Sequence, residues 1–212
     1  MGVIATAKVV TGTSTHRTVH IQPGNREWIT AVKCISAAGW ALPSMLIFAS
    51  KVHLSTWYTT DLPSGWTIAL SENGWTNDKL GYHWLTEIFD PYTRNRKVGR
   101  YRLLILDGHS SHITPEFDQY CLNHDIIPFC MPPHSSHLLQ PLDVGCFATL
   151  KRSYGRLMED YIRLGIHHVN KLDFITAYPT AYAEALTASN IHSGFAATGL
   201  VPFDPSQVLS KL

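Results

Sequence analysis

The first part of the chain contains short stretches that are typical of β-strands. Residues 5–10, 28–35 and 42–48 are rich in β-branched and other apolar residues, and the second of these stretches alternates with polar positions. The dipeptide Ala38-Gly39 lies between the second and third stretches and predicts an antiparallel hairpin. Residues 51–73 are rich in Trp, Gly, Ser and Pro, and we expect them to form a loop.

A change to helical spacing follows this loop. Apolar residues recur at helical intervals from Leu80 to Phe89, and Thr76-Asn77-Asp78 offers an N-cap just before them. Pro91 is expected to stop this helix, because proline has no backbone N–H to donate.

Two further strands are predicted on either side of a short helix. The run Tyr101–Asp107 has four consecutive aliphatic residues, which is typical of a central strand covered on both faces. Thr114-Pro115-Glu116 begins a helix that reaches about Asn123. Residues 126–131 form the next predicted strand, which Pro132-Pro133 ends.

A long helix is predicted to begin near Pro141. Gly145 and Gly155 each weaken it by about 1 kcal/mol relative to alanine. Its apolar face is marked by residues at 3-4-3-4 spacing, namely Phe147, Leu150, Tyr154, Leu157 and Tyr161. The predicted order of elements is that of an α/β fold, with three antiparallel strands, a mixed sheet and helices on both faces. We expect one core over residues 1–165 and a helical or irregular extension of the same domain over 166–212.

Composition is compatible with an ordinary folded core. The 212 residues are 45% hydrophobic and 16% charged, and the formal net charge is +1, so that bulk charge does not indicate nucleic-acid binding. No stretch approaches the ~18 apolar residues that span a membrane, and the first ten residues do not resemble a signal peptide. We therefore expect an intracellular protein, and we expect its cysteines to be buried free thiols, namely Cys34, Cys121, Cys130 and Cys146.

Two acids carry the candidate chemistry. Asp107 ends a predicted buried strand, and Asp143 lies in the first turn of the long helix. Each has a structural explanation when taken alone, a turn signal for Asp107 and a favourable helix dipole for Asp143. Two carboxylates that meet at one edge of a sheet, however, repel each other unless a cation lies between them. Oxygen ligands suit Mg²⁺ or Mn²⁺, and two such ions can promote phosphodiester cleavage.

The tetrapeptide His-Ser-Ser-His occurs beside each of these acids. His109 and His112 follow Asp107, whereas His134 and His137 precede Asp143. They are candidates for supporting the carboxylates and contacting phosphates, together with Gln140. Local hydrogen bonding, a zinc site or a Ser-His-Asp hydrolase built on the turn at residues 108–112 are alternatives.

Local clusters of positive charge are the candidates for a DNA-binding surface. Basic side chains gather ahead of the Asp107 strand and on the helix that begins near Asp143, and the predicted contacts are Arg94, Arg96, Lys97, Arg100, Lys151, Arg152 and Arg156. Solvated surface charge is the alternative explanation. Aromatic residues of the 51–75 region could stack on bases or pack in the core, namely Trp57, Tyr58, Trp66 and Trp75.

The motifs around the two acids resemble those of a known family. Leu104–His112 resembles the second-aspartate motif of DDE superfamily endonucleases (DDE-1 type) of the pogo and Fot1-like transposase group, and Pro132–Asp143 resembles their third-aspartate motif. The 35 residues between Asp107 and Asp143 suit the DD35D spacing of the Fot1-like branch. Residues 71–76 and 193–205 are also similar to segments of the family.

The resemblance implies a ribonuclease H-like (retroviral-integrase-type) fold and action on DNA in the nucleus. It also implies a two-metal site for Mg²⁺ or Mn²⁺ with Asp107 and Asp143 as ligands, cleavage at transposon ends, and a possible homodimer on paired ends. The family's first aspartate lies on a strand at the start of the core, whereas no acid precedes Glu27 here. The family's N-terminal helix-turn-helix region is not found either.

Three functions are therefore considered. The first is a transposase-derived endonuclease and strand-transfer domain that lacks its first aspartate and cannot cut DNA at a normal rate alone. The second is a domesticated, non-catalytic DNA-binding or scaffold protein. The third is the serine hydrolase.

Overall fold

The computed structural model of the chain describes residues 28–60, 62–107, 114–166 and 168–211. The strands are β1 (Ile29–Val32), β2 (Ile35–Ser36), β3 (Trp40–Ala41), β4 (Met45–Ala49), β5 (Thr67–Ser71), β6 (Arg102–Leu106) and β7 (Ile126–Cys130). The α-helices are α1 (Asp78–Trp84), α2 (Asp90–Arg94), α3 (Pro115–Asn123), α4 (Ser136–Leu139), α5 (Phe147–Arg163), α6 (Lys171–Ala185), α7 (Ala188–Ala197) and α8 (Ser206–Leu209). A 3₁₀ turn, η1 (Ser55–Tyr58), and two π-helical turns, η2 (Leu85–Phe89) and η4 (Leu142–Cys146), complete the described elements.

The strands form a small mixed arrangement. β1 is antiparallel to β4, and β5 is parallel to β4 on its other side, so the order is β1-β4-β5. β6 and β7 form a parallel pair in which Leu106 lies opposite Cys130. β2 and β3 form a short antiparallel ladder around the turn at Gly39, whose φ of +86° favours glycine. The predicted hairpin between residues 28–35 and 42–48 is confirmed.

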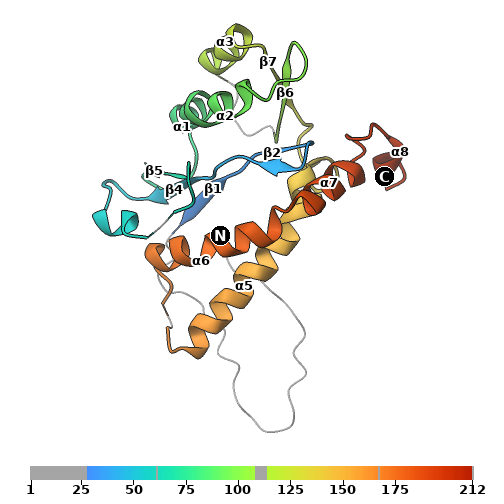
Figure 1. Ribbon diagram of the computed structural model, residues 1–212. Coiled ribbons are helices and arrows are strands. Elements are labelled where there is room, and N and C mark those ends of the chain that lie inside the picture. Colours follow the sequence, from blue (N-terminus) through green and yellow to red (C-terminus); the bar gives the residue numbers. More distant parts are fainter. Residues whose placement is uncertain (1–27, 61, 108–113, 167, 212) are drawn as a thin grey trace, which may run out of the picture.

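Strand β4 is covered on both faces. Met45 and Ile47 belong to one hydrophobic cluster with residues of α1, α3, β6 and β7, whereas Leu46 and Phe48 belong to another with residues of α5, α6 and α7. All four side chains are fully buried. Figure 1 shows the corresponding layers, with α1–α3 on one side of the strands and α5–α6 on the other. The expected α/β architecture with helices on both faces is therefore present.

The strands predicted over residues 101–107 and 126–131 are present as β6 and β7, and the predictions are incomplete elsewhere. The expectation that the first of them is a central strand covered on both faces was wrong, because β6 pairs only with β7 among the described strands and Leu103 is 61% exposed. The predicted strand over residues 5–10 lies outside the described residues. The expectation of a loop over 51–73 was wrong, because this region contains η1 and the strand β5. Strand β5, which pairs in parallel with β4, was not among the three antiparallel strands expected. Of those three, the two that the structure describes are antiparallel. Strand β5 has only five residues and is stabilised by pairing with β4. The residues around it are typical of turns, so the sequence did not predict a strand there.

Pro91 does not stop its helix, which contradicts the prediction. The helical segment continues through α1, η2 and α2 to Arg94. In the wider turn η2, the N–H of Asp90 donates to the carbonyl of Leu85. Proline interrupts the regular α-helical ladder at position i−4, and a π-helical turn at this point lets the chain pass Pro91 without breaking.

The other helix boundaries follow from side-chain caps. The side chains of Asn77 and Thr114 accept hydrogen bonds at the starts of α1 and α3, as predicted. Asn170 and Asp173 form a capping box that begins α6. Helices α6 and α7 contribute Tyr178 and Ile191 to the same cluster as α5. Residues 166–212 thus contain three helices, two of which pack in the core.

Candidate functional site

Asp107 directly follows the carboxyl end of β6. The parallel β6–β7 ladder holds this end in place, and the N–H of Met131 donates to the carbonyl of Leu106 at 2.8 Å. Leu104 and Leu106 are buried against the helices α1 and α3, which fixes one face of the strand. Asp107 itself is an exposed residue.

Asp143 lies in the π-helical turn η4, immediately before α5. Leu142 and Cys146 anchor this turn in the core, while Asp143 is half-buried. The N–H of Val144 donates to the carbonyl of Gln140 at 3.1 Å, so the turn continues directly from the segment that ends α4. The predicted long helix therefore exists, but it begins with a wider turn at the position of the acid.

The donor chemistry of the two acids fits a hard divalent cation. Mg²⁺ is commonly held by one or two carboxylates, with water and substrate phosphate oxygens as its other ligands. Within the described part of the chain, no group of three or more His, Cys, Asp or Glu side chains could hold a metal ion. Asp107 and Asp143 would supply two carboxylates to such a site. The zinc alternative depends in part on His109 and His112, which lie outside the described residues.

The histidines differ in how far the structure describes them. His109 and His112, and the turn on which the serine-hydrolase alternative depends, lie outside the described residues. His134 and His137 are exposed, and His134 has a φ of +60°, a conformation that few residues other than glycine adopt. Gln140 is half-buried and follows α4 directly. Their proposed supporting role stays a prediction.

A buried ion pair holds the opposite end of β6. The Asp90 side chain is 0% exposed, and its Oδ1 accepts a hydrogen bond from Nη2 of Arg102 at 2.6 Å. The hydroxyl of Tyr120 donates to Oδ2 at 3.0 Å, and Arg94 donates to the same oxygen. Burial raises the pKa of Asp90, but the hydrogen bonds from Arg94, Arg102 and Tyr120 outweigh it and lower that pKa to about 2.

Arg102 connects β6 with α2 and with the end of α3. Its Nη1 donates to Oγ1 of Thr93 at 2.8 Å, and its Nη2 donates to the carbonyl of His124 at 2.7 Å. The sequence placed Arg102 at the end of a basic run, but the structure makes it the anchor that fixes where β6 begins. Because β6 is short, this anchor also sets the position at which Asp107 leaves the sheet.

Three of the seven predicted DNA contacts are already in ion pairs. Arg94 binds Asp90, Lys97 Nζ lies 2.8 Å from Oδ2 of Asp125, and Arg156 Nη2 lies 2.5 Å from Oε2 of Glu184. The hydrogen bond from Ser153 to the same Glu184 oxygen, at 2.6 Å, further holds the last of these pairs. These three cations are therefore partly neutralised before any DNA binds.

The other four cations are exposed as well, but they differ in their contacts. The guanidinium of Arg96 lies 4.2 Å from the centre of the Trp40 ring, and that of Arg100 lies 5.0 Å from the Tyr101 ring. Lys151 and Arg152 are exposed on α5. Among the described residues, none of these four takes part in an ion pair. They are the strongest remaining candidates for phosphate contacts.

A half-buried lysine that the sequence did not indicate lies beside the start of α5. The ammonium of Lys33 lies 5.2 Å from the centre of the Phe147 ring and 5.3 Å from that of Tyr178. Burial lowers the pKa of Lys33 to about 7. No sequence signal distinguishes it from a surface lysine.

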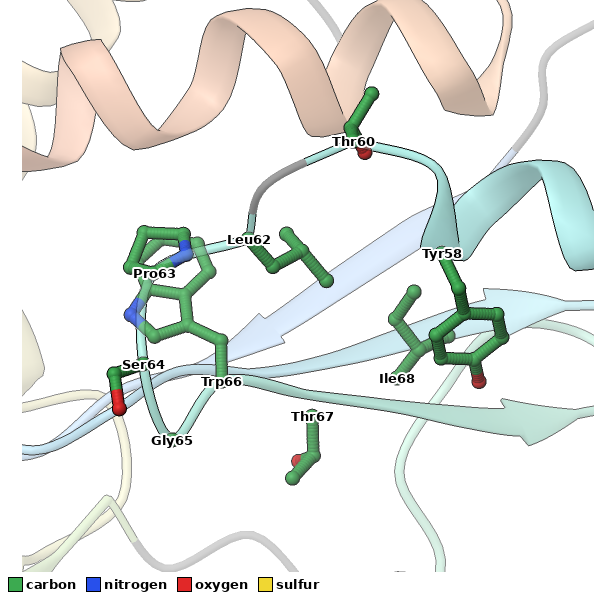
Figure 2. A pocket seen from close by; sticks show the side chains of 9 residues that line it. All are labelled: Tyr58, Thr60, Leu62, Pro63, Ser64, Gly65, Trp66, Thr67 and Ile68. Atoms are coloured by element: carbon green, nitrogen blue, oxygen red, sulfur yellow. The ribbon is translucent and has the colours of Figure 1, made fainter.

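The aromatic residues divide between core and surface. Trp57 is buried against Phe48, and Trp66 packs on Tyr178 and Tyr182. Trp75, in contrast, is 48% exposed. Figure 2 shows an open pocket of about 550 Å³, whose lining consists of Tyr58, Thr60, Leu62, Pro63, Ser64, Gly65, Trp66, Thr67 and Ile68. None of the described lining residues is Asp107 or Asp143, and none of them is an acid or a cation.

Comparison with known proteins gives one family match across most of the chain. The profile described as "DDE superfamily endonuclease" matches residues 25–195, a range that includes both Asp107 and Asp143. No solved structure matches the chain significantly.

Individual relatives carry varied names. A protein of Cochliobolus lunatus named "MFS-type transporter clz9" is 49% identical over 213 residues, which cover all of this chain and 23% of that protein. "Chaetoglobosin A biosynthesis cluster protein C" of Chaetomium globosum is 46% identical over 61 residues, covering 29% of this chain and 15% of that protein. The human "Pogo transposable element with ZNF domain" is 25% identical over 125 residues, covering 58% of this chain and 8% of that protein.

The matched regions thus span less than a quarter of the length of each of these relatives. In the part of the chain that the structure describes, no helix combines the length and the apolar character needed to cross a bilayer.

Proposed function

Because the chain belongs to the DDE superfamily endonucleases, we propose that it is a transposase-derived domain that binds DNA and holds a divalent cation with Asp107 and Asp143. The observation that carries this proposal is the placement of the two acids, one at the carboxyl end of β6 and the other in η4 at the start of α5. Ligand sites in open α/β sheets gather outside the carboxyl ends of strands. The layered arrangement around β4 is compatible with a ribonuclease H-like fold.

Two kinds of side chain have separate roles in this proposal, because carboxylates hold the metal ion and cations bind the DNA. Asp107 and Asp143 would hold Mg²⁺ or Mn²⁺, which when bound supplies Lewis acidity at a phosphodiester. The exposed carboxylate of Asp107 and the half-buried carboxylate of Asp143 leave room for water and phosphate oxygens as further ligands. The exposed cations of α5 and of the segment before β6 would bind the DNA backbone.

We further propose that these 212 residues alone do not cut DNA at a normal rate. Cleavage by two metal ions requires a fully formed ligand shell, and the described residues contain no group of three or more candidate ligands. A nuclear location and a homodimer on paired DNA ends are part of the same proposal. The non-catalytic alternative, a DNA-binding or scaffold protein, shares the DNA-binding surface but requires no metal ion.

Binding of Mn²⁺ tests the metal site. We expect the chain to bind Mn²⁺, as measured by the decrease of the free Mn²⁺ signal in electron paramagnetic resonance. Asp107→Asn and Asp143→Asn should each lower the affinity about 10-fold or more, because each removes an anionic ligand. Glu159→Gln is the matched control, since Glu159 is an exposed acid on α5. Equal affinity in all four proteins would refute the metal site.

The salt dependence of DNA binding tests the basic surface. Arg100→Ala and Lys151→Ala should each weaken binding to duplex DNA of any sequence. Each should also reduce the slope of log K against log[salt] by about 0.9 for every phosphate that the variant no longer neutralises. Arg163→Ala is the control, because Arg163 is also on α5 but pairs with Asp160 at 3.0 Å. An unchanged slope in both variants would exclude these residues from the interface.

A further inference from the structure

Helix α7 crosses the turn that holds Asp143 at a point where both elements have glycine. Gly145 belongs to η4 and Gly194 to α7. Figure 1 shows α7 passing the start of α5 at this crossing. Sequence reasoning could treat Gly145 only as a residue that weakens the helix, whereas the structure gives it a packing role.

The two backbones are too close to admit any side chain. A methyl group on Gly145 would lie 2.6 Å from the carbonyl oxygen of Asn190 and 2.6 Å from Cα of Gly194. A methyl group on Gly194 would lie 2.5 Å from the carbonyl oxygen of Pro141. All of these neighbours are backbone atoms, which cannot rotate away as a side chain can. Any larger residue must therefore push the two elements apart.

Helix α7 contacts the turn on both sides of Asp143. Pro141 and Gly145, the two contact points on the turn, lie two residues before and two residues after Asp143. On the other side, α7 is fixed in the core by the fully buried Ile191. The turn is held in the same core by Leu142 and Cys146, so neither element can retreat freely, and widening the crossing disturbs the turn that carries Asp143.

We propose that Gly145 and Gly194 are positioning residues for the metal site, because their contact sets where the carboxylate of Asp143 lies. This inference rests on the proposed function in taking Asp143 as a metal ligand. The glycines do not touch the cation; they act through the backbone of η4. Because a metal site tolerates only small errors in the position of its ligands, a shift of this turn weakens cation binding while the fold persists.

Gly155 supplies a matched control on the same helical segment. It lies in α5, and a methyl group on it would meet nothing within 4 Å. Gly155→Ala should therefore leave the turn in place. The comparison of Gly194→Ala and Gly145→Ala with Gly155→Ala separates the close approach from the general effect of placing alanine in a helix.

Two measurements on the full chain test the proposal, after circular dichroism has shown each variant to be folded. Hydrogen exchange followed by mass spectrometry should show faster exchange over residues 141–147 in Gly194→Ala and Gly145→Ala, but not in Gly155→Ala. The Mn²⁺ affinity of the first two variants should fall about 10-fold or more, and that of the third should not change.

The outcomes distinguish this inference from the proposed function. If the wild-type chain binds no Mn²⁺ but exchange in 141–147 responds to Gly194→Ala, the metal site fails while the close crossing stands. If the wild-type chain binds Mn²⁺ and Gly194→Ala binds it equally well, the positioning role is overturned and the metal site survives. Loss of the fold in both crossing variants also overturns the proposal, since it requires a folded chain with a displaced Asp143.

Discussion

Replacing Asp90 by asparagine is expected to lower the free energy of unfolding by about 3–5 kcal/mol. The asparagine keeps the shape of the side chain but removes the negative charge that faces Arg102. The Arg102 side chain is only 9% exposed, so its guanidinium would be left in a poorly hydrated site without a counter-charge. Thermal or urea unfolding, followed by circular dichroism, measures the change.

Asp125→Asn is the matched control for this prediction. Asp125 also pairs with a cation, Lys97, at 2.8 Å, but its side chain is 48% exposed. Its φ of +55° is one that asparagine adopts readily, so the backbone is not disturbed. We expect little change in stability, because exposed ion pairs are screened by solvent. Similar unfolding midpoints for the two variants would contradict the assignment of Asp90 as a buried anchor.

The same carboxylate predicts a pH dependence. The pKa of Asp90 is lowered to about 2 in the folded chain, whereas an unfolded aspartate has a pKa of about 3.9. Its contribution to stability is therefore complete above about pH 4 and is lost as the pH falls from about 4 towards 2. In the Asp90→Asn variant this part of the acid destabilisation should be absent. An unchanged acid profile in the variant would show that other carboxyl groups control this range.

The second large effect concerns catalysis. We expect the isolated 212-residue chain to show no Mn²⁺-dependent nicking of supercoiled plasmid DNA above the rate of its Asp107→Ala variant. A displacement of about 1 Å in a catalytic group can cost about 10²-fold in rate, and an incomplete ligand shell places the attacking water less precisely still. We therefore expect the chain to bind DNA and a cation without cutting DNA at a useful rate.

The pattern of nicking among the variants would show whether the expectation of an inactive chain is wrong. Metal-dependent nicking that Asp107→Ala abolishes and Glu159→Gln preserves would show that these residues form a complete nuclease site. Nicking that persists equally in both variants would point instead to a contaminating nuclease. DNA binding without any Mn²⁺ binding would favour the non-catalytic DNA-binding or scaffold protein over the transposase-derived nuclease domain.

The sequence predicted those elements that depend only on residues close to them in the chain. The aliphatic run of β6 and the Thr114 cap of α3 each depend on neighbouring residues, and both are confirmed. Strand β5 was missed, because its stability comes from parallel pairing with β4 rather than from its own composition. Pro91 was misjudged for a similar reason, since the π-helical turn that carries the chain past it is a property of the whole helical segment.

Candidate site residues could be named from sequence motifs, whereas the role of a charged residue such as Arg102 could not be inferred from the charge pattern. The acids Asp107 and Asp143 could be named because each ends or begins a recognisable element. Arg102 could not be told apart from its basic neighbours, because its partners come from α2 and from the end of α3, 9 to 22 residues away. Likewise, Cys121 and Cys146 are buried as expected, whereas Cys34 is half-buried and Cys130, the last residue of β7, is exposed.

The shared metal site is tested most directly by anomalous diffraction from crystals of the chain soaked in Mn²⁺. We expect one anomalous peak within coordination distance, about 2.0–2.1 Å for a magnesium-type site, of carboxylate oxygens from both Asp107 and Asp143. If no peak is shared and the two carboxyl groups lie far beyond reach of a common ion, the proposed metal site is wrong.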